Sequence, residues 1–414
     1  MSLQVDHRQL YRLPWNLADN AITWLEPTTK CNLYCEGCYR ENDPQGHKPL
    51  EQVIEELQTV KRLRNTDGIS IAGGEPLLYP HILELVRYVA DQGWKPIVNT
   101  NGRALTPELV AKLLSAGVVG FTFHVDSHQN RPGWKGKSEE DLNELRLKLA
   151  RMVYKHGKGK IAVAFNATIY RDTLDDIPML VNWAQENIEF VNTIVFILFR
   201  SATTKADYEG WVHGKKVDLS ELVYTFEREV SPKDIVAQEV IDRIQTVFPD
   251  YQPCGYLNGT EDVSAFKWLV GLRFGNPKRM LGCMDPKLME LAQTAHHVVW
   301  RTYLAYTSPR LMRNAGVILP VGLINKSLAR VAKNYLAHPG GWGEPLRMQA
   351  IMIIQPCDIQ PDGRQSMCDG CPDIIAHDGR LVWSCRVDEL QKFGGFVSFG
   401  PREGGAQQSP AQSA

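Results

Sequence analysis

A chain of 414 residues with 43% hydrophobic and 22% charged residues can bury one large core or two to three ordinary ones, which excludes a disordered or fibrous protein. Its 46 Lys and Arg residues nearly balance its 47 Asp and Glu residues, so the net charge of −1 gives no overall field to attract nucleic acid. No stretch approaches the roughly 18 consecutive apolar residues of a membrane span, and the N-terminus lacks the apolar core of a signal peptide. We therefore expect a cytoplasmic protein without a nucleic-acid partner.

Strand and helix patterns alternate along the first half of the chain. The predicted strands cover residues 21–26, 68–72, 96–99, 120–126, 160–168 and 193–199. The predicted helices between them cover residues 50–64, 80–92, 107–115, 138–155 and 174–187. This alternation favours a parallel sheet or barrel, whose functional site lies at the carboxyl ends of the strands.

Three cysteines follow the first predicted strand, at Cys31, Cys35 and Cys38, and the next cysteine is Cys254. A four-iron cluster takes one thiolate per iron, so three thiolates leave one iron open to a small molecule. The alternatives are a zinc site that borrows a fourth ligand, or chance clustering.

The second predicted strand ends in Gly73, Gly74, Glu75 and Pro76. Two glycines let the backbone approach a ligand closely, and the Glu75 carboxylate could accept hydrogen bonds from an ammonium group. Taken alone, such a sequence is more often a plain turn.

The cysteine spacing followed by Gly-Gly-Glu-Pro resembles the radical S-adenosylmethionine (SAM) enzymes. The resemblance implies a partial (β/α)6 TIM-like barrel in which Cys31, Cys35 and Cys38 hold a 4Fe-4S cluster and SAM chelates the open iron. It also implies that SAM is reductively cleaved to a 5′-deoxyadenosyl radical that removes hydrogen from an unactivated C–H bond. The electron would come from a donor such as flavodoxin or ferredoxin. The chain departs from the family at Gly37, where an aromatic residue usually contacts the adenine.

Polar residues near the ends of the next predicted strands are further candidates for SAM contacts. By the same resemblance, they would meet the ribose or carboxylate of SAM; they are Thr100, Asn101, Asp126, Ser127 and Asn166. The alternative is local capping, with Asn-Gly as a turn and Asp126 as an N-cap. The sequence singles out no catalytic residue.

A second group of cysteines lies near the C-terminus, at Cys357, Cys368, Cys371 and Cys385. Four thiolates are a complete ligand set for either a 4Fe-4S cluster or a structural zinc. Radical SAM enzymes often carry such a domain, and the resemblance implies an auxiliary 4Fe-4S cluster. Cys254 and Cys283 are expected to be small buried hydrophobic residues, or else ligands or substrate contacts.

Residues 291–343 contain no acidic residue, whereas they include six cations, namely Arg301, Arg310, Arg313, Lys326, Arg330 and Lys333. Aromatic residues and the apolar run 315–324 accompany them. This composition suits a region that rests on anionic lipid headgroups on the inner membrane face. The alternatives are an apolar tunnel with a phosphate-binding entrance and an ordinary helical insert.

The substrate hypothesis is a lipid-like molecule, because residues 123–128 and the run 368–372 are similar to the radical SAM branch containing tetraether lipid synthases. The alternative is a peptide or small metabolite. The expected domains are a radical SAM partial barrel (1–205), a mainly helical, basic and apolar insert (206–345), a cysteine-rich domain (346–400) and a disordered tail (401–414).

Overall fold

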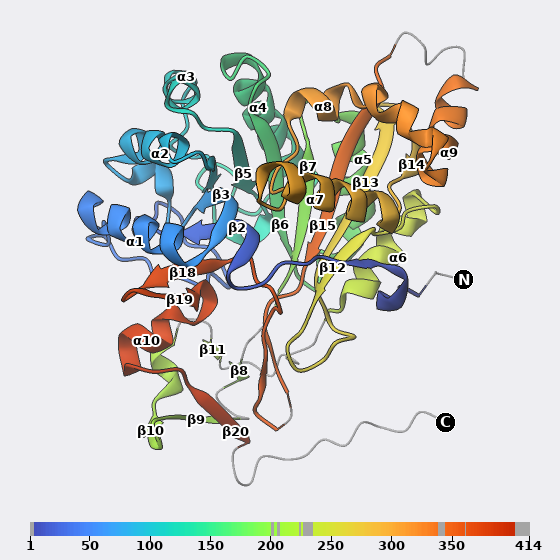
Figure 1. The fold of residues 1–414 in the computed structure, drawn as a ribbon. Coiled ribbons are helices and arrows are strands. Elements are labelled where there is room, and N and C mark those ends of the chain that lie inside the picture. The colour runs from blue at the N-terminus through green and yellow to red at the C-terminus, as the bar shows by residue number, and fades with distance from the viewer. Residues whose placement is uncertain are drawn as a thin grey trace, which may run out of the picture.

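An 11-stranded sheet forms the centre of the computed structural model, which describes residues 4–199, 203–204, 208–222, 225–226, 235–337, 344–360 and 362–401. The strands run in the order β1-β12-β13-β15-β7-β6-β5-β4-β3-β2, and β14 pairs with β13. Six consecutive parallel strands make up one half (Figure 1). They are β2 (Asp19–Leu25), β3 (Asn65–Ile71), β4 (Lys95–Thr100), β5 (Gly120–His124), β6 (Ala162–Ile169) and β7 (Thr193–Leu198).

Helices follow the first five of these strands and cover one face of the sheet (Figure 1). They are α1 (Leu50–Leu63), α2 (Ile82–Asp91), α3 (Pro107–Ala116), α4 (Leu142–His156) and α5 (Ile177–Glu186). Helix α3 illustrates the local signals. The Thr106 side chain accepts a hydrogen bond from the Leu109 amide at 3.2 Å, and the helix ends at Gly117 in the left-handed region. The predicted strands, helices and mixed α/β class are confirmed.

The segment 206–345, which we expected to be a mainly helical insert, contains strands over much of its first half and helices in its second half. Besides α6 (Ala237–Val247), it contains β9 (Tyr208–Val212), β10 (Lys215–Val217), β12 (Gly255–Asn258), β13 (Phe266–Asn276) and β14 (Arg279–Cys283). Most of β13 is buried on both faces. Such a strand lacks the alternation that identifies half-exposed strands, so its pattern did not reveal it.

Strand β15 (Arg347–Ile354) lies within the range expected for the cysteine-rich domain, but it belongs to the central sheet. It lies parallel to β7 and antiparallel to β13. The barrel half therefore continues through β15 and β13 rather than ending at β7. Two hydrophobic clusters fill the two faces: one under α1–α6, the other under the later helices.

The second cluster is covered by α7 (Pro286–Trp300), α8 (Pro309–Arg313), the 3₁₀ helix η6 (Ala315–Leu323) and α9 (Lys326–Leu336) (Figure 1). The loop between α7 and α8 closes the amino end of the parallel strands. The Ala305 amide donates to Asp67 at the start of β3 at 2.9 Å, and the Tyr306 hydroxyl lies 3.1 Å from that of Thr122.

No single described helix is long and apolar enough to cross a membrane. Taken together, η6 and α9 are long and apolar enough, but the two helices are bent by 120° relative to each other. The pair meets the criterion by length and composition alone.

The cysteine-rich end of the chain folds beside β2 and α1 (Figure 1). It contains β16 (Asp358–Ile359), β17 (Gln365–Ser366), the hairpin of β18 (Ile374–His377) and β19 (Arg380–Trp383), α10 (Val387–Phe393) and β20 (Ser398–Pro401). Strand β20 pairs with β9. Strand β1 (Tyr11–Arg12) pairs with β12, and β8 (Thr203–Thr204) with β11 (Thr225–Phe226). Apart from Pro401, the expected tail lies outside the described residues.

Candidate active site at the carboxyl ends of the strands

The Gly-Gly-Glu-Pro turn lies directly against the backbone that leads into the first cysteine loop. The Gly74 amide donates to the Thr28 carbonyl at 2.8 Å, and the Glu75 amide donates to the Lys30 carbonyl at 2.8 Å. Gly73 has a φ of +101°, and a Cβ atom there would lie 2.2 Å from the Thr28 oxygen. Only glycine fits this left-handed, crowded position, so the two glycines hold the two loops together.

The Glu75 carboxylate is fully buried and already has three donors. Its Oε1 accepts from the Leu77 amide at 3.0 Å and from the Thr100 hydroxyl at 2.6 Å, and its Oε2 accepts from the Asn101 amide at 2.8 Å. Burial raises the pKa of Glu75, and these hydrogen bonds partly offset the shift. Glu75 therefore joins the ends of β3 and β4, and Pro76 begins the short helix that follows.

The thiols of the first cysteine loop lie near one another and near this turn. The Asn101 amide nitrogen lies 3.8 Å from Cys31 Sγ and 2.8 Å from Asn32 Oδ1. Burial raises the pKa of Cys35, and the neighbouring Cys38 thiol adds to the rise. Thr100 and Asn101 are thus brought to the cysteine loop, as expected for one shared site.

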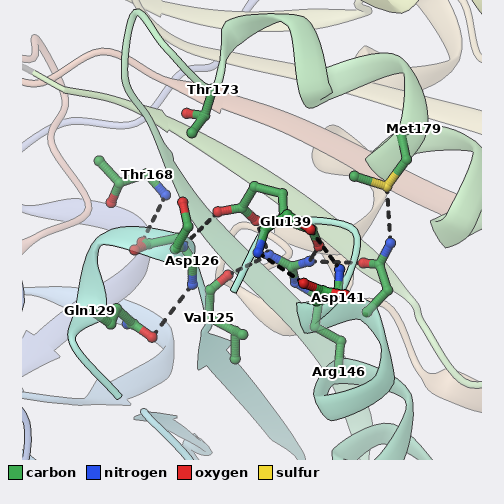
Figure 2. Close-up of polar contacts among 12 residues, drawn as sticks. Val125, Asp126, Gln129, Glu139, Asp141, Arg146, Thr168, Thr173 and Met179 are labelled. Carbon is green, nitrogen blue, oxygen red and sulfur yellow. Dashed lines mark hydrogen bonds and ion pairs between the residues drawn. The ribbon is translucent and has the colours of Figure 1, made fainter. Parts of the chain in front are cut away.

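Asp126 and Ser127 belong to a buried polar network at the end of β5, shown in Figure 2. Asp126 accepts from the amides of His128 at 3.1 Å and Thr168 at 3.2 Å, and caps a short 3₁₀ helix. The Ser127 amide donates to Glu139 at 2.6 Å, and Glu139 pairs with Arg146. The contact with His128 fits the local capping alternative, whereas the donor Thr168 comes from the neighbouring strand β6.

The face of the sheet opposite α1–α6 carries polar side chains near the cysteine loop. Within the described residues, Asn99 Nδ2 and Asn166 Oδ1 are buried without a hydrogen-bond partner. Buried polar atoms normally have partners, so both could bind a ligand. His124 lies beside Asn166 in register, with its Nε2 2.8 Å from Asp126 Oδ2 and 3.0 Å from Thr168 Oγ1.

Asn99 and His124 were not among the predicted site residues. Strand alternation was the signal that could have found them, because Val98 and Phe123 pack under the helices and their neighbours must face the other way.

The four C-terminal cysteines come together in pairs. The Cys357 thiol lies beside that of Cys385, and the Cys371 thiol lies beside that of Cys368. The hydrogen bond from Cys385 holds the pKa of Cys357 below its usual value.

The second cysteine group is attached firmly to the barrel. Arg64 donates to the Cys371 carbonyl at 2.9 Å, and Asn20 donates to the Gly370 carbonyl at 3.0 Å. A Cβ on Gly370 would lie 2.2 Å from the Trp15 carbonyl oxygen, so a glycine is required where this turn meets the segment before β2. Next to Cys357, the buried pair Lys267 and Asp358 is 2.8 Å apart.

Cys254 and Cys283 lie apart from both groups. Cys254 is fully buried in the hydrophobic cluster under α7–α9, and burial raises its pKa to about 12. Burial also raises the pKa of Cys283 to about 11. Cys254 agrees with the small buried hydrophobic residue expected from the sequence, whereas Cys283 is only partly buried.

The described residues include no group of three or more His, Cys, Asp or Glu side chains positioned around a single metal ion. A four-iron cluster needs a different arrangement, since each thiolate binds its own iron. The first cysteine loop offers thiolate donors for such a cluster. The amide atoms of Asn99 and Asn166 that lack hydrogen-bond partners could bind a small molecule beside it.

Residues 25–184 match the model of the Radical SAM superfamily. The chain contains a radical SAM domain. The matched residues run from the end of β2 through most of α5, and they include both the first cysteine loop and the Gly-Gly-Glu-Pro turn. The match to this superfamily implies a 4Fe-4S cluster and SAM for that domain.

Several relatives share this radical SAM domain. The chain is 29% identical to the AdoMet-dependent heme synthase of Methanosarcina barkeri over 47% of its length and 57% of that protein. It is 34% identical to the S-adenosylmethionine-dependent nucleotide dehydratase of Selenomonas ruminantium over 23% of its length and 36% of that protein. SuiB of Streptococcus suis, solved with SAM bound, is 20% identical, with a TM-score of 0.35 over 44% of this chain and 41% of SuiB. The chain spans less than two thirds of each.

Proposed function

We propose that the chain is a radical SAM enzyme in which Cys31, Cys35 and Cys38 hold a 4Fe-4S cluster with one iron open to SAM. When bound and reduced, the cluster would supply one electron to SAM, which would break down to methionine and a 5′-deoxyadenosyl radical able to take a hydrogen atom from an unactivated C–H bond. The observation that carries the proposal is the contact between the cysteine loop and the Gly-Gly-Glu-Pro turn at the carboxyl ends of β2 and β3.

The residues around this loop divide into supporting and contacting groups. Gly73, Gly74, Glu75 and Pro76, with Thr100, hold the turn, and Asp126 and Ser127 hold the end of β5 through backbone contacts. In this proposal, Asn166 and Asn101 contact SAM or substrate directly, together with Asn99 and His124. The unpaired amide atoms of Asn99 and Asn166 support this assignment.

The proposal assigns an auxiliary 4Fe-4S cluster to Cys357, Cys368, Cys371 and Cys385. Its support is that the four thiols lie in neighbouring pairs and that hydrogen bonds fix their backbone to the barrel. Each thiol must lose its proton to bind iron, so these pairs would separate as the cluster forms. A structural zinc is the alternative ligand. A soluble donor such as flavodoxin or ferredoxin would supply the electron.

We propose a lipid-like substrate that enters from the carboxyl ends of the strands, since residues 301–306 close the amino end. Its support is the sequence resemblance. The alternative is a peptide or a small metabolite. The names of the heme synthase and the nucleotide dehydratase support a small metabolite.

Anaerobic reconstitution of the full chain with iron and sulfide tests the central proposal. After reduction with dithionite, the protein should convert SAM to 5′-deoxyadenosine and methionine, measured by liquid chromatography. Cys35→Ala should abolish both products, whereas Cys254→Ala, which removes a thiol outside both groups, should keep them. Product release by Cys35→Ala at the rate of the unaltered protein would overturn the assignment.

Metal analysis tests the second cysteine group separately. Cys371→Ala should bind about half the iron of the unaltered protein, because each cluster holds four irons. Zinc lost from Cys371→Ala at constant iron would instead favour the structural zinc.

Lipid extracts from cells that express the unaltered protein or Cys35→Ala test the substrate. A lipid absent from the variant cells, with an accumulated precursor of related mass, would support the lipid-like substrate. Identical lipid profiles with confirmed expression would favour a peptide or small metabolite.

A further inference from the structure

Hydrophobic side chains are exposed at the elbow between η6 and α9, which we define as residues 317–333. Leu323 is 92% exposed and Ile324 is 83% exposed, and Val317 on η6 is 67% exposed. Of the 14 large hydrophobic residues that are exposed among the described residues, eight lie between positions 291 and 336. A concentration of this kind marks a surface that meets another apolar phase, whereas scattered exposed residues do not.

The outer face of α9 carries a row of positive charges beside this apolar tip. Lys326, Arg330 and Lys333 are all exposed, and their spacing of four and three residues places them on one side of the helix. The other side packs inward through Leu328 and Val331. In the described part of the chain, these three cations form no ion pair with an acidic side chain.

We propose that this elbow docks the protein on the surface of an anionic lipid bilayer, with Leu323 and Ile324 inserted among the headgroups and the α9 cations against lipid phosphates. Charge complementarity favours this occupant. The absence of any Asp or Glu between positions 291 and 343 removes the repulsion that an anionic surface would otherwise meet. An apolar tip flanked by Lys and Arg is the usual composition of an interfacial helix.

The elbow lies at the opposite end of the strands from the cysteine loop. Next to it, Arg313 donates to the Glu189 carbonyl ahead of β7 at 2.9 Å, and the Ala315 amide donates to the Leu346 carbonyl ahead of β15 at 2.8 Å. A strand of seven residues such as β2 is roughly 20 Å long. A docked protein would therefore keep its cysteine loop on the side away from the bilayer, open to a soluble electron donor. This inference does not depend on the radical chemistry.

Co-sedimentation of the full chain with vesicles tests the docking surface. The protein should bind vesicles of phosphatidylcholine mixed with phosphatidylglycerol, bind pure phosphatidylcholine much less, and dissociate as salt is added. Replacing both Leu323→Ser and Ile324→Ser should weaken binding roughly 100-fold, because both side chains lose their apolar burial. Each of Lys326→Gln, Arg330→Gln and Lys333→Gln should weaken it about fivefold.

A matched control removes the same number of charges from another helix. Lys148, Arg151 and Lys155 are exposed on α4 at a spacing of three and four residues, and their replacement by Gln should leave vesicle binding unchanged. All substituted positions are exposed, so the fold should persist, which circular dichroism checks.

Two outcomes would overturn the proposal. One is that the unaltered protein fails to bind anionic vesicles, or binds them as well when Leu323 and Ile324 are replaced. The other is a dimer in analytical ultracentrifugation that dissociates in the Leu323→Ser, Ile324→Ser variant while vesicle binding is absent, which would assign the elbow to self-association. Formation of 5′-deoxyadenosine is measured without vesicles, so failure of docking and failure of the proposed activity can be told apart.

Discussion

Arg40 and Asp388, 348 residues apart in the sequence, form a buried ion pair in which Nη1 lies 3.0 Å from Oδ1. The same guanidinium donates from Nε to Glu26 Oε2 at 2.7 Å and from Nη2 to the Ser384 carbonyl. Arg40 follows the first cysteine loop by two residues, and Ser384 directly precedes Cys385. One side chain therefore connects the segments that carry the two proposed clusters.

Replacing Arg40 should destabilise the fold strongly. Arg40→Gln would leave Glu26 and Asp388 buried without their partner, at a cost of about 3–5 kcal/mol. Arg40→Lys should recover only part of the loss, because an ammonium cannot make the same forked set of hydrogen bonds. Urea unfolding measures both variants. Arg364→Gln, which breaks exposed ion pairs, is the control and should have little effect. A midpoint for Arg40→Gln equal to that of the control would contradict this role.

Gly73→Ala should disturb the first cysteine loop through a steric collision in addition to backbone strain. The new Cβ would collide with the Thr28 carbonyl, and the left-handed φ adds about 1–2 kcal/mol. Gly93→Ala is a matched control, since Gly93 also has a positive φ, of +85°, but has nothing within 4 Å of the added Cβ. Iron bound after anaerobic reconstitution should fall for Gly73→Ala and stay constant for Gly93→Ala. Equal iron content in the two variants would show that the close contact is unimportant.

Glu75→Gln separates a supporting role from a purely ligand-binding one. The carboxylate accepts three hydrogen bonds, and an amide would turn a donor toward other donors in the protein interior, at a cost of about 1–3 kcal/mol. The free energy of unfolding without SAM should therefore fall. Glu55→Gln on the exposed side of α1 serves as the reference and should be neutral. If Glu75 served only to hold SAM, both variants would unfold alike.

The stability of the structure around the cysteine loop should depend on pH because of His128. Its Nδ1 lies 3.0 Å from Glu36 and its Nε2 3.3 Å from Asp172, and its ring stacks on Tyr170. Burial lowers the pKa of His128, but the hydrogen bond to Glu36 and the charges of both carboxylates raise it more, so the net shift is upward. The charged His128 therefore stabilises the fold fully at pH values below its unfolded-state pKa of about 6.5. This stabilisation is lost as the pH rises through the higher pKa of the folded state.

The variant His128→Phe keeps a stacking ring and removes the charge. The difference in unfolding midpoint between the unaltered protein and this variant should be largest near pH 6 and should shrink toward pH 9. His81→Phe, at an exposed position before α2, is the control. A difference that stays constant over this range would mean that the His128 charge adds no stability.

The sequence alone revealed the features that depend on neighbouring residues. The spacing of Cys31, Cys35 and Cys38 is local, and so are the caps and the periodicity that define α1–α5 and β2–β7. Helix propensity, capping and alternation act within a few residues, so these elements are readable before any fold is known.

The tertiary structure decided what depends on contacts between distant residues. Strand β15 entered the sheet between β7 and β13, although its sequence stood next to the second cysteine group. Glu75 and Asp126 became buried acceptors because donors reach them from other strands and loops, and Asn99 Nδ2 and Asn166 Oδ1 have no hydrogen-bond partner among the described residues. Residues 301–306 came to lie at the amino end of the strands, and so did the segment that leads into the exposed elbow. Burial and hydrogen bonding are set by residues far apart in the chain, and no local pattern encodes which of them meet.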